Sequence, residues 1–121
     1  MRSLPLPVRI FVCTQPADMR RSFDGLAQMV REFLGADPLS GHLFVFRSKR
    51  GDRLKLLYWD SDGLAIWYKR LEQGSYHFPP PPANGHGIEL RAAELAMLLD
   101  GVDLASVKRR QRYRRPAAAT P

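Results

Sequence analysis

The sequence predicts an α+β protein with a mostly antiparallel sheet of four or five strands, one long N-terminal helix and one short C-terminal helix. Three observations lead to this prediction. Residues 41–71 alternate apolar stretches with turn residues, residues 17–34 repeat apolar side chains with a helical period, and 45% of the 121 residues are hydrophobic. A chain of this length and composition can bury a hydrophobic core, so we expect one globular domain.

Five segments are predicted to be strands, because each joins β-branched, aromatic or other apolar residues between turn signals. They are residues 8–13, 42–46, 54–59, 64–71 and 75–78. The third is apolar on both faces, which is typical of a central strand. Residues 60–63 provide the turn that follows it, where we expect Gly63 to adopt a positive φ.

Two segments are predicted to be helices. In residues 17–34, one apolar stripe is formed by Met19, Phe23, Leu26, Val30, Phe33 and Leu34. Gly35 is a natural end for this helix. The second helix spans about residues 91–100 and ends at Gly101. Between the sheet and this helix, the prolines at 79–82 predict a stiff polyproline spacer.

The net charge of +7 is concentrated near the C-terminus. Residues 108–115 hold six of the 19 basic residues and no acid, namely Lys108, Arg109, Arg110, Arg112, Arg114 and Arg115. Residues 1–107 then carry 13 basic and 12 acidic side chains, a net charge of +1. We therefore expect a nearly neutral globular domain at 1–107 and a basic, disordered tail at 108–121.

Two groups of basic residues are candidates for nucleic-acid binding. The turn between the second and third strands contains Arg47, Lys49, Arg50 and Arg53, which are suited to ordered phosphate contacts. An ordinary solvated turn is the alternative. The basic residues of the tail form an arm of the kind that binds nucleic acid non-specifically, with a solubilising tail as the alternative.

Aromatic side chains on the predicted strands give a further possibility. We expect about four of the six to form the core, and the others could stack on unpaired bases. The six are Phe44, Phe46, Tyr58, Trp59, Trp67 and Tyr68. Neighbours such as Trp67 and Tyr68 must point to opposite faces of the sheet.

The sequence offers no catalytic or metal-binding pattern. Its three histidines are far apart, and none lies at metal-ligand spacing from Cys13. Asp60 and Asp62 fall in a turn, where Asp is favoured by its local hydrogen bonds, whereas a two-metal nuclease needs clustered carboxylates. No glycine-rich phosphate loop precedes a helix. We expect no enzymatic activity, metal or cofactor, and one cysteine excludes an internal disulfide.

The sequence also lacks the features of a secreted or membrane protein. Its first residues do not contain the long apolar stretch of a signal peptide. No window reaches the roughly 18 apolar residues of a membrane span. We therefore expect a cytoplasmic location and no membrane partner.

Short motifs along most of the chain, from about Pro5 to Arg115, occur together in a fixed order. They are DMRRSFDGLA at 18–27, DPLSGHLFVFR at 37–47, RGDRLK at 50–55, YWD at 58–60, YKRLE at 68–72 and LLDGVD at 98–103. No single motif is specific, but together they make the chain similar to the TnpB-type accessory proteins of bacterial insertion sequences of IS family 66. These are the products of the second open reading frame of such elements.

The resemblance implies a non-catalytic accessory protein of transposition, a form of DNA recombination, encoded beside a larger transposase that carries the catalytic acids. The implied partners are the element-encoded transposase, the other accessory protein and DNA. We expect the chain to bind DNA or to bridge DNA and the transposase. A protein-interaction subunit of the transposition complex, without direct DNA contact, is the alternative. A nuclease that uses Asp60 and Asp62 is the least favoured possibility. The family transfers no catalytic or ligand residues, and the oligomeric state stays open.

Overall fold

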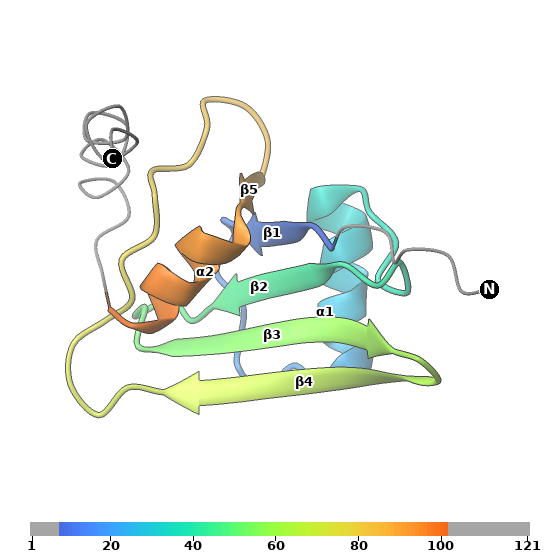
Figure 1. Ribbon diagram of the computed structural model, residues 1–121, viewed down its shortest axis with the longest axis horizontal. Coiled ribbons are helices and arrows are strands. Elements are labelled where there is room, and N and C mark those ends of the chain that lie inside the picture. Colours follow the sequence, from blue (N-terminus) through green and yellow to red (C-terminus); the bar gives the residue numbers. More distant parts are fainter. Residues whose placement is uncertain (1–7, 102–121) are drawn as a thin grey trace, which may run out of the picture.

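The computed structural model describes residues 8–101 of the chain. In chain order its elements are β1 (Ile10–Cys13), α1 (Phe23–Met29), η1 (Val30–Leu34), β2 (Leu43–Arg47), β3 (Arg53–Asp60), β4 (Gly63–Arg70), β5 (Gly87–Leu90) and α2 (Ala92–Leu99). Figure 1 shows one sheet with α2 lying across one face and α1 against the other.

The five strands follow the order β4-β3-β2-β1-β5, so β4 and β5 are the edge strands and β3 lies inside the sheet, as predicted. β1 and β2 run parallel, whereas the other three neighbouring pairs are antiparallel. The sheet is therefore mixed. The predicted strand at 75–78 is wrong. There Tyr76 donates its backbone N–H to Gly51 O at 2.8 Å and is buried, so this stretch packs on the sheet without extending it.

The prediction of one long N-terminal helix is also wrong, because both helical segments are short. The first starts at Phe23 and ends, after the π-helical η1, at Leu34. Residues 17–22 are not helical, and two of their carbonyl groups accept hydrogen bonds from a side chain of the sheet instead of from a helical backbone. The buried ammonium group of Lys55 on β3 donates to Met19 O at 2.8 Å and to Arg21 O at 2.7 Å. Helices attached to a mixed sheet remain compatible with the α+β class.

The core has two layers, one on each face of the sheet, because side chains alternate along every strand. The layer beneath α2 comprises Ile10, Val12, Val45, Leu54, Leu56, Tyr76, Leu90, Leu95 and Leu98. The layer beneath α1 comprises Cys13, Ala17, Leu26, Ala27, Met29, Val30, Phe44, Phe46 and Leu57. Burial raises the pKa of the Cys13 thiol, which behaves as a small apolar core residue.

The aromatic side chains of the strands are buried to different degrees. Phe44 and Phe46 are fully buried, and Tyr58 and Trp59 on β3 are partly buried. On the edge strand β4, Trp67 keeps 40% of its surface exposed and Tyr68 keeps 47%, on opposite faces. The exposed aromatic surface therefore lies at the β4 edge of the sheet. On the α1 face, the ammonium group of Lys55 lies 4.7 Å from the centroid of the Tyr68 ring.

The turn between β3 and β4 has the predicted position, but the expected conformation of Gly63 is wrong. Gly63 pairs with Asp60 and does not adopt a positive φ, whereas Ser61 has φ 58°. A positive φ at the first of two loop residues is the pattern of a type II′ hairpin, in which glycine is the usual residue. Ser61 therefore carries the backbone strain of this turn.

Candidate nucleic-acid interface

A groove of about 420 Å³ lies where the loop between β2 and β3 approaches the segment before α1. We call it the basic groove. One wall is formed by residues 48–53 and the other by residues 17–20. Its charged residues are Asp18, Arg20, Lys49, Arg50, Asp52 and Arg53. Four basic side chains thus share one hollow with two carboxylates.

Local hydrogen bonds hold the loop wall in place. Ser48 N donates to Arg53 O at 3.0 Å, and Arg53 N donates to Ser48 Oγ at 3.1 Å. Gly51 supplies the positive φ of 80° that reverses the chain, and its N–H donates to Ser48 O at 3.0 Å. The loop is further tied down by Leu71 N, which donates to Asp52 O at 2.8 Å. The positions from which Lys49 and Arg50 project are therefore fixed by backbone geometry.

The opposite wall is held by Lys55, which is only 7% exposed. Its two hydrogen bonds to Met19 O and Arg21 O draw residues 19–21 against β3. A third tie is the bond from Ala17 N to Arg47 O at 2.9 Å. Lys55 is thus a positioning residue for Arg20. No local pattern indicated this role, since Lys55 alternates with leucines like an exposed strand residue.

The two carboxylates in the basic groove already have partners. Asp18 accepts hydrogen bonds from the Arg20 side chain, the shortest at 2.7 Å, and these bonds lower the pKa of Asp18 to about 2. Asp52 Oδ1 accepts from Ser48 Oγ at 3.2 Å. Neither carboxylate pairs with the remaining cations. The side chains of Lys49, Arg50 and Arg53 make no hydrogen bond or ion pair with any residue between 8 and 101. These three cations are therefore available to an anion.

The structure brings three of the four predicted turn residues together and separates the fourth. Arg47 Nη2 donates to Thr14 O at 3.2 Å, and its guanidinium carbon lies 6.0 Å from the centre of the Phe78 ring. Arg47 therefore serves packing and does not line the groove. The predicted tail residues lie outside the described residues: Lys108, Arg109, Arg110, Arg112, Arg114 and Arg115.

Basic residues beyond the groove extend the positive charge along the end of β4. Arg70 lies directly opposite Arg53 in the β3–β4 ladder, and Lys69 lies opposite Leu54. Like charges directly opposite each other in a sheet are destabilising. Glu72 offsets part of this repulsion, because its carboxylate oxygen Oε2 lies 3.3 Å from Arg70 Nη2. The sequence held a signal for this pairing, because a hairpin centred on residues 61 and 62 must align 53 with 70.

The near-zero net charge of the folded part hides an uneven distribution of charge. The charged residues of the basic groove and of the adjoining end of β4 are six basic residues and three acids, whereas the rest of residues 8–101 holds six basic residues and eight acids. The six are Arg20, Lys49, Arg50, Arg53, Lys69 and Arg70, and the three acids are Asp18, Asp52 and Glu72. A nearly neutral body therefore still presents a positive field at one end.

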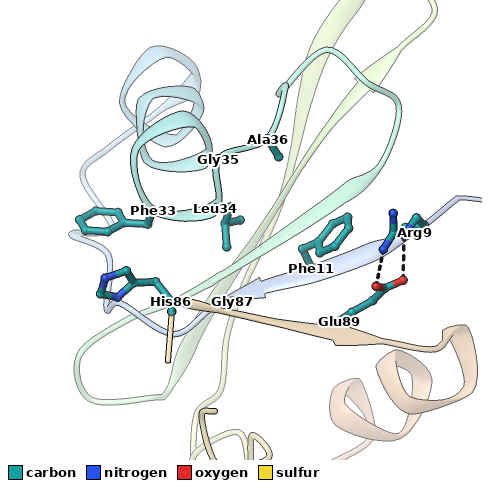
Figure 2. A pocket seen from close by; sticks show the side chains of 10 residues that line it. Arg9, Phe11, Phe33, Leu34, Gly35, Ala36, His86, Gly87 and Glu89 are labelled. Carbon is teal, nitrogen blue, oxygen red and sulfur yellow. Dashed lines mark hydrogen bonds and ion pairs between the residues drawn. The ribbon is translucent and has the colours of Figure 1, made fainter. Parts of the chain in front are cut away.

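A second hollow, of about 520 Å³, lies at the other edge of the sheet and is drawn in Figure 2. We call it the edge pocket. Arg9 and Glu89 form a bidentate ion pair across it: Arg9 Nη2 donates to Glu89 Oε1 at 2.6 Å, and Arg9 Nε donates to Glu89 Oε2 at 2.9 Å. This pairing raises the pKa of Arg9 and lowers that of Glu89. Phe33 and His86 meet edge to face, with centroids 5.3 Å apart. The cation of this pocket is already neutralised.

The described residues contain no group of three or more His, Cys, Asp or Glu side chains that could hold a metal ion. Asp60 and Asp62 are exposed at the two-residue turn between β3 and β4.

Within residues 8–101, neither helix has the length and apolar character needed to cross a membrane.

Comparison with known proteins identifies the family. Residues 8–109 match the family described as "IS66 Orf2 like protein". The chain belongs to this family. It is 43% identical to the uncharacterized protein y4jC of Sinorhizobium fredii over 103 residues, which cover 85% of this chain and 86% of that protein. It is 41% identical to the uncharacterized protein y4hO of the same organism over 96 residues, 79% of this chain and 82% of that protein. No solved structure matches the chain. Membership of the IS66 Orf2 family confirms the predicted resemblance and supports an accessory role in transposition.

Proposed function

We propose that this IS66 Orf2 family member is a non-catalytic transposition accessory protein that binds DNA through its phosphate backbone. The observation that carries the proposal is that three cations have no side-chain partner among residues 8–101: Lys49 and Arg50 on the well-held loop and Arg53 at the start of β3. Phosphate oxygens are the anions that such side chains bind most often on nucleic acids.

The geometry favours backbone binding over reading of bases. No helix lines the basic groove, so no recognition helix is available there to enter a major groove. The groove offers flexible side chains at a loop tip, which suit the regular spacing of phosphates. We therefore expect weak dependence on DNA sequence and strong dependence on salt.

The test is a DNA-binding titration with a duplex of random sequence at several salt concentrations. Each phosphate contact contributes about −0.9 to the slope of log K against log salt concentration. The double variant Lys49→Ala/Arg50→Ala should therefore flatten the slope by about 1.8. A control, Arg31→Ala, removes an exposed cation elsewhere that has no partner among residues 8–101, and should leave the slope nearly unchanged. A groove variant with the same slope as this control would refute the groove as the DNA site.

The predicted tail contribution is tested separately. Truncation after Val107 removes six basic residues and should flatten the slope by about 5 if all of them contact phosphates. Because the groove variant and the truncation remove different residues, their effects should add. A truncated protein that binds as tightly and with the same salt dependence would show that the tail only improves solubility.

The non-catalytic part of the proposal rests on the position of the acids. Asp60 and Asp62 lie at an exposed hairpin tip, without walls that could exclude water from a metal-bound reaction. Incubation with DNA and Mg²⁺ or Mn²⁺ should give no cleavage. Cleavage that is lost in Asp60→Ala would overturn this part of the proposal.

A second candidate, a protein-interaction subunit without direct DNA contact, is favoured by the exposed Trp67 and Tyr68 on β4. Exposed aromatic side chains are common at protein interfaces. The salt titration above distinguishes the two candidates. A DNA-binding protein should bind the duplex and lose affinity in the groove variant, whereas an interaction subunit should not bind the duplex at all.

A further inference from the structure

The two edge strands of the sheet, β4 and β5, differ in length and in what holds them in place. β5 has four residues, and the Arg9–Glu89 ion pair ties it to the start of β1. β4 has eight residues, its outer edge pairs with no strand within residues 8–101, and its ladder with β3 runs without a bulge from Arg70 to Gly63. A long, regular and unpaired edge is a template for another strand.

The side chains of β4 add apolar surface to this edge. Leu64 and Ile66 pack partly against the layer beneath α1, and Tyr68 points to the same face. Ala65 and Trp67 point to the α2 face. Trp67 and Tyr68 are among the most exposed large hydrophobic side chains of residues 8–101. A partner along β4 would therefore contact aromatic surface on both faces of the sheet.

The charges at the two ends of β4 have opposite sign. Asp62 lies just before its beginning, in the hairpin turn and next to Asp60 at the end of β3, and Lys69 and Arg70 lie at its end. A second copy in parallel would place like charges together. An antiparallel copy would place the basic end of each strand beside the acidic turn of the other, so the charge pattern selects the antiparallel orientation.

We propose that β4 pairs antiparallel with β4 of a second copy of this chain, about a two-fold axis at Ile66. In an antiparallel pair, facing residues point to the same side of the sheet, and along one strand only residues an even number of positions apart do so. When both strands are copies of β4, the residue numbers of each facing pair must therefore add up to an even number. With Ile66 opposite itself, Trp67 lies opposite Ala65, Tyr68 opposite Leu64, and Arg70 in line with Asp62. Each exposed aromatic side chain gains a smaller apolar partner, and each copy supplies both members of a charge pair.

Each of the two neighbouring registers loses at least one of these advantages. With Trp67 on the axis, Arg70 lies opposite Leu64, so both pairs between Arg70 and Asp62 are lost. With Ala65 on the axis, Tyr68 faces the carboxylate of Asp62 in place of an apolar side chain, and Arg70 has no β4 residue opposite it, because Asp60 belongs to β3. We therefore assign the register centred on Ile66, which joins the two five-stranded sheets into one continuous sheet.

The experiment measures association of the full chain, freed of nucleic acid, by sedimentation equilibrium. The wild type should form a dimer that weakens as salt is raised. Arg70→Glu and Asp62→Arg each turn two attractive contacts into two repulsive ones, so each should weaken the dimer by about tenfold or more. The pair Arg31→Glu and Glu32→Arg makes the same charge changes on η1, which contacts β1 far from β4, and should leave the dimer unchanged.

Mixing the two β4 variants gives the sharper outcome. In a mixed dimer, the unchanged Asp62 of one copy meets the unchanged Arg70 of the other. In the second contact, the glutamate introduced at position 70 meets the arginine introduced at position 62, so both pairs are opposite in charge. An equimolar mixture should restore association that neither variant shows alone. Circular dichroism shows whether each variant is folded. A folded wild type that stays monomeric at about 100 μM, a concentration at which contacts of biological strength are populated, or a mixture no stronger than its components, overturns the proposal.

Discussion

The basic groove and the edge pocket are similar in size, and both contain arginine side chains, but their cations are in different states. In the edge pocket, Arg9 adjoins β1 and Glu89 lies on β5, so the pairing of these strands places a carboxylate within reach of the cation. In the basic groove, Lys49 and Arg50 project from a loop with no strand opposite them. Arg9 therefore finds its partner on the neighbouring strand, whereas Lys49 and Arg50 have no carboxylate within reach among residues 8–101 and are left for a ligand.

The second difference concerns what holds each hollow. The edge pocket is tied by an exposed ion pair between side chains, which salt screens. The basic groove is held by backbone hydrogen bonds and by one buried ammonium group, that of Lys55. The groove therefore keeps its shape at the salt concentrations at which its ligand would dissociate.

The largest effect is expected from Lys55→Met, which keeps much of the length of the side chain but removes its hydrogen bonds. Two carbonyl groups lose a charged donor, so the free energy of unfolding should fall by about 2–3 kcal/mol. Residues 19–21 should also lose their anchor on β3. Urea denaturation measures the stability, and amide exchange measures the local opening.

The matched control for this prediction is Lys69→Met, the same change on an exposed side chain of β4. It should alter the free energy of unfolding by no more than about 0.5 kcal/mol. A Lys55→Met variant as stable as this control would mean that the groove wall does not depend on Lys55.

The second prediction frees one cation in each hollow. Asp18→Asn removes the carboxylate beside Arg20 but keeps an oxygen for the Arg20 backbone N–H, from which Asp18 Oδ1 accepts at 2.9 Å. Glu89→Gln likewise removes the carboxylate beside Arg9. If only the basic groove binds DNA, Asp18→Asn should steepen the salt slope by up to about 0.9 and raise affinity several-fold at low salt.

Glu89→Gln is then the control, because its freed arginine lies at the opposite edge of the sheet. It should leave the DNA affinity and its salt slope close to wild type. Equal gains in the two variants would indicate that DNA responds to net charge alone and would remove the distinction between the hollows.

The third prediction separates stability from binding at the acidic end of β4, away from both hollows. Ser61→Gly relieves the positive φ of the hairpin turn and should raise the free energy of unfolding by about 0.5–1 kcal/mol. Ser75→Gly, at an exposed position without positive φ, should not stabilise the protein. Thermal unfolding measures both. DNA affinity should stay unchanged in Ser61→Gly, since the turn lies at the end of β3 remote from the basic groove.

Much of the sheet could be predicted from the sequence, because the apolar alternation of residues 42–71 and the turn at 60–63 are local signals. The N-terminal helix was predicted too long for a physical reason. Its apolar stripe extends back to Met19, but the backbone there is bonded to Lys55, which is 36 residues away in the chain. No local pattern contains that bond. The fifth strand was misplaced for a similar reason, since β5 is selected by pairing with β1.

The candidate site was only partly predictable for the same reason. Lys49, Arg50 and Arg53 are close in sequence, so their clustering was visible. Arg20 joins them only through the tertiary path of residues 17–20, and Arg47 leaves them because β-strand alternation turns it to the α2 face. Pairing of charges decides which cations are free, and that pairing depends on side-chain positions that local patterns do not contain.

The smallest effect concerns the titration of Asp18. Because hydrogen bonds from Arg20 favour the charged carboxylate, its pKa is lowered from the ordinary 3.8 to about 2. A lowered pKa in the folded state stabilises the protein above the unfolded value, and this contribution disappears as the pH falls through about 2. Asp18 is therefore fully charged at any pH near neutrality, and acidification from about pH 8 to about pH 5 should not imitate Asp18→Asn in DNA binding. Carbon-detected NMR of the carboxyl group should give a midpoint near 2 in the wild type and a higher midpoint in Arg20→Ala, still below the ordinary 3.8 because the backbone N–H of residue 20 continues to donate to Asp18. An unchanged midpoint in Arg20→Ala would mean that Arg20 is not bound to Asp18 in solution, and Arg20 would then count with Lys49, Arg50 and Arg53 among the free cations of the groove.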